Sequence, residues 1–182
     1  MNLYAYAGNN PISYDDPFGL WPGEVHDMLI KHALKAIGVS DARITAIQKA
    51  SRAFDASLSS QSAGNAYMHA MKSPGQSNED AIKATNAFIQ GKTAEAKADL
   101  AAGNEKGYIN AMAQAMHAEM DETSPWHRDA NGNPIQWNGV LSGLHGDSHT
   151  QHKGESGARP SPGEVQASDQ MLRQTYQEAS SP

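Results

Sequence analysis

Residues 108–128 read YINAMAQAMHAEMDETSPWHR, and this stretch decides the fold. Alanine, methionine, glutamine and glutamate, which favour helices, fill most positions between Tyr108 and Thr123. A proline interrupts helical hydrogen bonding, so Pro125 marks the point where the helix must already have ended. The sequence therefore predicts one long helix that is followed at once by a change of chain direction.

Helical periodicity extends over most of the remaining chain. Apolar residues recur every three or four positions, and Gly38 and Asp41 are the expected stop and N-cap between the first two helices. The expected elements are helices over 22–37 and 41–55, a loop over 59–66, helical stretches over 79–90 and 92–102 with a break at Gly91, and a last helix over 165–176. This pattern predicts an all-α fold.

Length and composition restrict the possible chemistry. The 182 residues suit a single domain with one core. Because cysteine is absent, any metal must be held by His, Asp, Glu or backbone groups. The first twenty residues have no hydrophobic region of a signal peptide, and no apolar run is long enough to span a membrane.

A candidate metal-binding pair lies on the predicted central helix. His117 and Asp121 are four residues apart, so both side chains project from one face and can bind the same cation. The turn at Pro125 brings His127 back toward that edge. Imidazole and carboxylate groups suit zinc, and a carboxylate can bridge two ions. On its own, a His and an Asp at this spacing are more often a solvent-exposed hydrogen-bonded pair.

Two further residues stand at unusual positions that favour the metal hypothesis. His69 lies in the apolar segment Ala-Tyr-Met-His-Ala-Met, where a lone histidine is more often a core residue. Asp55 is expected at the end of a helix, where a negative charge is unfavourable with respect to the helix dipole. Together with residues 117–127 they supply the second carboxylate and the third imidazole that a multinuclear site needs.

The order of these residues resembles the zinc-dependent phospholipase C and S1/P1 nuclease superfamily. The likeness covers roughly residues 21–155, and its most specific part is the spacing from His117 through Asp121 and Pro125 to His127. It implies an all-α enzyme that binds three zinc ions and hydrolyses phosphodiesters.

The likeness also implies particular ligands for two of the ions. One zinc would be held by His69, His117, Asp55 and Asp121. Asp121 would bridge to a second zinc, which is completed by His26 and the backbone of Trp21. Asp55 would have a second, catalytic role as the general base that accepts a proton from water. His32, six residues after His26, falls on a different helix face and is expected at the surface.

The third zinc site has two possible sets of ligands. His127 would start it, and the family completes it with a further histidine and a nearby acid. His152 and Glu155 are three residues apart and share a helical face, so we expect this pair. The alternative is His145 with His149.

The first twenty residues resemble a different family. NLYAYAGNNPISYDDPFGL is similar to the closing motif of the core region of Rhs-family polymorphic toxins, including Asp16, Pro17, Gly19 and Leu20. In that family the β-shell protein cuts itself after this motif and frees a C-terminal toxin. The likeness implies that residues 1–20 are a short β and turn remnant of an Rhs core and residues 21–182 the toxin domain. Cleavage would give Trp21 a free α-amine that can bind zinc.

Together the two resemblances imply an antibacterial toxin that a contact-dependent system, such as type VI secretion, delivers into a target cell. Its expected partners are an encapsulating Rhs shell and a cognate immunity protein. The net charge of −6 favours phospholipid at a membrane surface as the substrate. The short gap from Trp21 to His26 favours instead a nuclease acting on nucleic acid. A third alternative is a non-catalytic interaction domain that is stabilised by metal.

Overall fold

The computed structural model describes residues 23–139 and 159–181 of the chain. Within these ranges the protein is helical and has isolated β-bridges but no strand, which confirms the predicted all-α class. The elements are α1 (Gly23–Ala36), α2 (Asp41–Asp55), η2 (Ala63–His69), α3 (Asn78–Ala101), α4 (Glu105–Thr123), η3 (Pro125–His127) and α5 (Pro162–Ser180), where η denotes a 3-10 helix.

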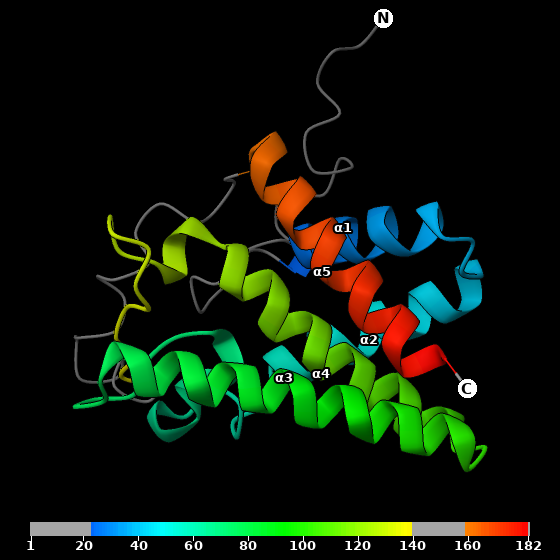
Figure 1. Ribbon diagram of the computed structural model, residues 1–182, viewed down its shortest axis with the longest axis horizontal. Helices are drawn as coiled ribbons and strands as arrows, with labels where there is room; N and C mark the ends of the chain where they lie inside the picture. Colours follow the sequence, from blue (N-terminus) through cyan, green and yellow to red (C-terminus); the bar gives the residue numbers. More distant parts are fainter. Residues whose placement is uncertain (1–22, 140–158, 182) are drawn as a thin grey trace, which may run out of the picture.

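Helix α4, which contains the predicted central helix, lies in the middle of the fold. Figure 1 shows α3 running alongside α4, with α1, α2 and α5 on the other side of α4. Met112, Met116 and Met120 follow one another at intervals of four residues and are fully buried. Burying a side chain of this size contributes roughly 2 kcal/mol relative to leaving it exposed. Packing on several sides therefore holds α4 in place.

The helix ends agree with the sequence pattern in most places. Gly38 has a φ of 80°, the left-handed conformation that ends α1, and its N–H donates to the Lys35 carbonyl. The predicted cap of α2 was wrong by one residue. Ser40 is the N-cap, its hydroxyl accepts from the Arg43 N–H, and Asp41 is the first helical residue. An acid in this first turn still suits the helix dipole.

Two other local predictions were wrong. Helix α3 continues through Gly91 without a break, because packing along α4 outweighs the cost of about 1 kcal/mol for a glycine inside a helix. The expected loop over 59–66 is a loop only at its start, since η2 begins at Ala63. His69 is the last residue of this 3-10 helix, and Ala70 then takes a left-handed conformation with a φ of 53°.

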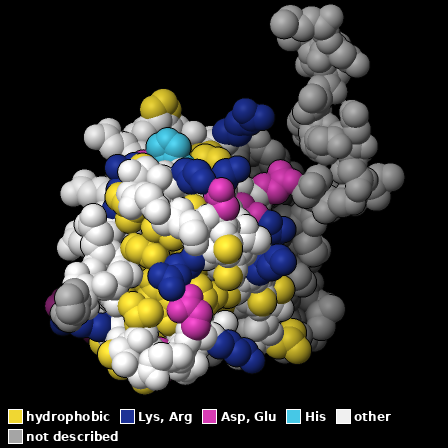
Figure 2. All heavy atoms as spheres, turned by 90° about the vertical axis from the view of Figure 1, so that its right-hand side faces the viewer, with side chains coloured by type: hydrophobic (Ala, Val, Ile, Leu, Met, Phe, Trp, Pro, Cys, Tyr) yellow, Lys and Arg dark blue, Asp and Glu magenta, His cyan; other side chains and the backbone are white. Residues whose placement is uncertain are grey.

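The described surface carries charges of both signs. Figure 2 shows Lys and Arg side chains interspersed with Asp and Glu, and hydrophobic side chains between them, on the face that looks out to the right of Figure 1. In the described part of the chain, no helix is long and apolar enough to cross a membrane.

Candidate metal centre

Five elements bring six ligand-type side chains together at one end of α4. They are His26 on α1, Asp55 on α2, His69 on η2, His117 and Asp121 on α4, and His127 on η3. The four histidines and Asp121 are at most 1% exposed. The side chain of Asp55 is 18% exposed, so it forms the accessible edge of the group.

The Asp121 carboxylate lies among all four imidazoles. Its Oδ2 is 2.9 Å from His69 Nδ1 and 3.1 Å from His117 Nε2. Its Oδ1 is 3.1 Å from His26 Nε2 and 3.9 Å from His127 Nδ1. The two oxygens thus divide the histidines into two pairs.

The pair on the Oδ2 side has the spacing of a coordination shell. His69 Nδ1 and His117 Nε2 are 3.1 Å apart, so with Asp121 Oδ2 they form a compact triangle. Asp55 Oδ1 lies 3.5 Å from His117 Nε2 and 3.9 Å from His69 Nδ1. Tetrahedral zinc with bonds of about 2.0 Å separates its ligand atoms by about 3.3 Å. The donor set and its spacing therefore fit a metal ion.

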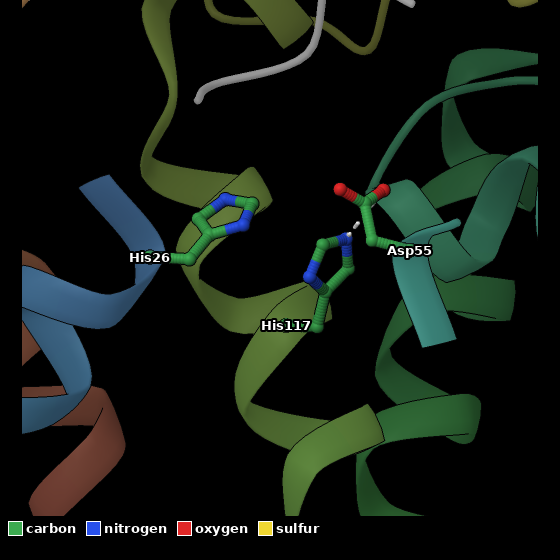
Figure 3. Close-up of side chains that lie close together, drawn as sticks. All are labelled: His26, Asp55 and His117. Atoms are coloured by element: carbon green, nitrogen blue, oxygen red, sulfur yellow. Dashed lines mark ion pairs between the residues drawn. The ribbon is translucent and has the colours of Figure 1, made fainter. Parts of the chain in front are cut away.

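In Figure 3, the imidazoles of His26 and His117 and the Asp55 carboxylate face a common space, each from a different helix. The rings of His26 and His117 meet edge to face at a centroid distance of 4.5 Å. His26, Asp55 and His117 form one group that could hold a metal ion, and His69, His117 and Asp121 form another. His117 belongs to both groups.

The electrostatics keep Asp121 anionic. Burial opposes the charged form, but the neighbouring charges of His117 and His127 and the hydrogen bonds from His117 and His26 hold the pKa of Asp121 well below its usual range. Burial likewise disfavours a protonated His69, yet the hydrogen bond and charge of Asp121 and the charge of Asp55 raise the pKa of His69. Both shifts favour an anionic Asp121 that is hydrogen-bonded to its imidazole neighbours.

Two local turns and two hydrogen bonds between distant segments explain how His69 and His127 reach the cluster. His127 ends the 3-10 turn that begins at Pro125, with its N–H donating to the Ser124 carbonyl at 3.2 Å. His69 ends η2, and the residues after it pair with the segment that follows His127. Lys72 N–H donates to the Ile135 carbonyl at 3.0 Å, and Trp137 N–H to the Lys72 carbonyl at 2.9 Å. These bonds join the segment after η2 to the segment after η3, the two 3-10 helices that carry His69 and His127.

Two polar side chains contact the ligands and were not predicted from the sequence. Ser51 Oγ is 3.3 Å from His117 Nδ1, the ring nitrogen that faces away from the cluster. Gln61 Nε2 donates to Asp55 Oδ1 at 3.1 Å. Ser51 lies one turn before Asp55 on the apolar face of α2, so helical periodicity could have found it. Gln61 lies in a Ser- and Gln-rich loop and gave no such signal.

Several predicted site residues lie outside the described residues. They are Trp21, His152 and Glu155, the alternative pair His145 and His149, and the cleavage residues Asp16, Pro17, Gly19 and Leu20. His32 is described, and its imidazole is 58% exposed and paired with Asp169, which agrees with the surface position expected for it.

No family model matches this chain, and neither the curated proteins nor the solved structures give a match. By their geometry, the His and Asp groups around Asp121 could hold a metal ion.

Proposed function

We propose that this protein is a zinc-dependent hydrolase of phosphodiester bonds. The observation that carries the proposal is the position of Asp121, a buried anion whose two oxygens face separate pairs of histidines. Sites that hydrolyse phosphate esters commonly contain metal ions clustered in this way. A purely structural zinc site is closed by its protein ligands, whereas Asp55 leaves one edge of this cluster accessible.

Each residue has a distinct part in the proposed reaction. Asp121 would bridge two ions. His69, His117 and Asp55 would complete the ligands of one ion, while His26 and His127 lie beside the other oxygen of Asp121. When bound, zinc supplies Lewis acidity toward a phosphoryl oxygen and activates water near neutral pH. Asp55, the partly exposed carboxylate, is the group that can take up the proton of the attacking water.

Phospholipid is the proposed substrate in preference to nucleic acid. The formal net charge is −6, and a protein that binds a polynucleotide usually presents a basic surface to the phosphates. The mixed charges of the face in Figure 2 agree with this choice. In the biological setting that the Rhs-like motif of residues 1–20 implies, the protein would act as a toxin on the membrane of a competing cell.

The direct test incubates the zinc-loaded chain with phosphatidylcholine and phosphatidylethanolamine vesicles and, separately, with single-stranded DNA and RNA. We expect release of phosphorylated head groups that EDTA abolishes and zinc restores. Asp55→Asn should remove this activity, whereas Asp41→Asn, at the opposite end of the same helix, should not. Cleavage of nucleic acid alone would show the nuclease alternative. Stoichiometric zinc without either activity would show the non-catalytic alternative.

Cleavage after residues 1–20 is a second part of the proposal. An uncut backbone amide nitrogen has no available lone pair, so Trp21 could bind zinc through its nitrogen only after cleavage behind Leu20. We expect a chain that begins at Trp21 to hold more zinc and to be more active than the full 182-residue chain. Equal zinc content and equal activity would contradict this processing step.

A further inference from the structure

Gln61 is a buried polar residue beside the accessible edge of the cluster. It lies in the turn between α2 and η2 and is only 2% exposed. Its side-chain Nε2 donates two hydrogen bonds to one residue, to the Asp55 carbonyl at 2.8 Å and to Asp55 Oδ1 at 3.1 Å. One amide group thus fixes both the backbone and the carboxylate of the last residue of α2.

The chemistry of the contact fixes the orientation of this amide. Only its NH₂ group can face two oxygen atoms, since a reversed amide would place a carbonyl oxygen against both of them. The other end, Oε1, is buried and has no hydrogen-bond partner among the described residues. Leaving a buried acceptor unpaired costs about 1–3 kcal/mol. A side chain selected for stability alone would be expected to satisfy both of its ends.

Capping the helix does not require Gln61. Ser60 is fully buried, and its hydroxyl lies 2.7 Å from the carbonyl oxygen of Phe54 at the same helix end. What Gln61 adds is the bond to the carboxylate. Asp55 needs such a bond, because it is the only described residue of the cluster that is partly exposed and because its charge opposes the helix dipole.

We infer that Gln61 is the positioning residue of Asp55, on which the proposed hydrolysis depends. Its amide keeps Oδ1 turned toward His117 and His69, at 3.5 and 3.9 Å, so that this oxygen is in place for the cation. Partners of this kind orient metal ligands, and their loss typically lowers metal affinity about 10- to 100-fold. The inference rests on the proposed metal site and adds a residue that no ligand motif contains.

The test replaces Gln61 with methionine, which keeps the volume and removes the amide. We expect the zinc affinity of Gln61→Met, measured by competition with a chromophoric chelator, to fall about 10- to 100-fold. The matched control Ser60→Ala removes a hydrogen bond from the same helix end without touching the carboxylate. It should lower the melting temperature of the metal-free chain but leave zinc affinity within about twofold of wild type.

A double-mutant cycle shows whether Gln61 acts through Asp55. In an Asp55→Ala background, Gln61→Met should have little further effect on zinc affinity, because the group it orients is gone. Full additivity would overturn the inference, as would a Gln61→Met variant that binds zinc like wild type.

The same measurements separate this inference from the proposed function. If Gln61→Met weakens zinc binding but the wild-type protein hydrolyses no phosphodiester, the positioning role stands and the proposed function fails. If the wild type is active and Gln61→Met binds zinc normally, the function stands and the positioning role fails. A wild-type chain that binds no zinc would overturn both.

Discussion

Two buried carboxylates on α4, Asp121 and Glu119, are two residues apart and face opposite sides of the helix. Asp121 lies among imidazoles, which hold its pKa well below the usual range in spite of burial. Glu119 faces α5, where the Thr175 hydroxyl donates to it, and burial raises its pKa to about 7. With similar burial, the neighbours decide the charge: one side of α4 keeps an anion and the other favours a proton.

The strongest test of this contrast is to remove the charge on each side in turn. Asp121→Asn leaves one acceptor oxygen and no negative charge between the two histidine pairs. We expect zinc affinity and phosphodiesterase activity to fall by at least roughly a thousandfold, since the lost charge interactions are worth several kcal/mol. Glu119→Gln, the matched change on the other side, should leave both near wild type. Zinc content by mass spectrometry and vesicle hydrolysis provide the measurements.

Removing metal should have the next largest effect. The cluster around Asp121 is built from side chains of five elements, so an ion bound there would stabilise the folded chain over the unfolded one. Zinc at about a thousand times its dissociation constant adds about 4 kcal/mol. This corresponds to a rise in melting temperature of roughly 10 °C for a chain of this size. Scanning calorimetry after EDTA treatment and after zinc addition should show the rise in wild type and in Glu119→Gln. A similar rise in Asp121→Asn would contradict the assigned site.

Protonation of Glu119 should instead make the free energy of unfolding depend on pH. Because the folded-state pKa of about 7 exceeds the ordinary glutamate pKa of 4.5, the proton binds more tightly to the folded chain. The associated stability is fully present below pH 4.5 and is lost as the pH rises through 7. The loss is on the order of 3 kcal/mol. Urea unfolding at several pH values, with the same zinc content throughout, should show this slope in wild type and a smaller one in Glu119→Gln. Equal slopes would contradict the protonation of Glu119.

The smallest expected effect concerns His32, which is on the same helix as His26. His32 Nδ1 lies 2.8 Å from Asp169 Oδ2, but its imidazole is 58% exposed. Exposed ion pairs contribute about 0–1 kcal/mol. We expect His32→Gln to lower the unfolding free energy by less than about 1 kcal/mol and to leave zinc binding unchanged, whereas His26→Gln should weaken zinc binding. Loss of zinc in His32→Gln would show that the two α1 histidines are not functionally distinct.

The sequence predicted the helical class and most of the residues that meet at the centre. Helical periodicity is a local property, so the course of α4 and the common face of His117 and Asp121 followed from spacing alone. The continuity of α3 did not, because packing on α4 overrides the weak helix propensity of Gly91. Local propensity cannot show such a tertiary contribution.

The details of the cluster depend on contacts between distant segments. The turn at Pro125 predicted that His127 lies near the site, whereas His26 was placed there only through a family resemblance. Neither could show that both histidines lie beside the same oxygen of Asp121. The role of Gln61 could not be predicted, because it depends on the loop after α2 turning back to the end of that helix. A polar residue in a polar segment carries no periodic signal.

The sequence separation of the ligands has a consequence for the order of folding. His26 and Asp121 are 95 positions apart, His69 and Asp121 are 52 apart, and His69 and His117 are 48 apart. Contacts that close such long loops form slowly, whereas the neighbouring helices α3 and α4 can pair early as a local hairpin. The complete set of ligands therefore comes together late, and metal uptake by a refolding chain should follow the slowest phase of helix assembly.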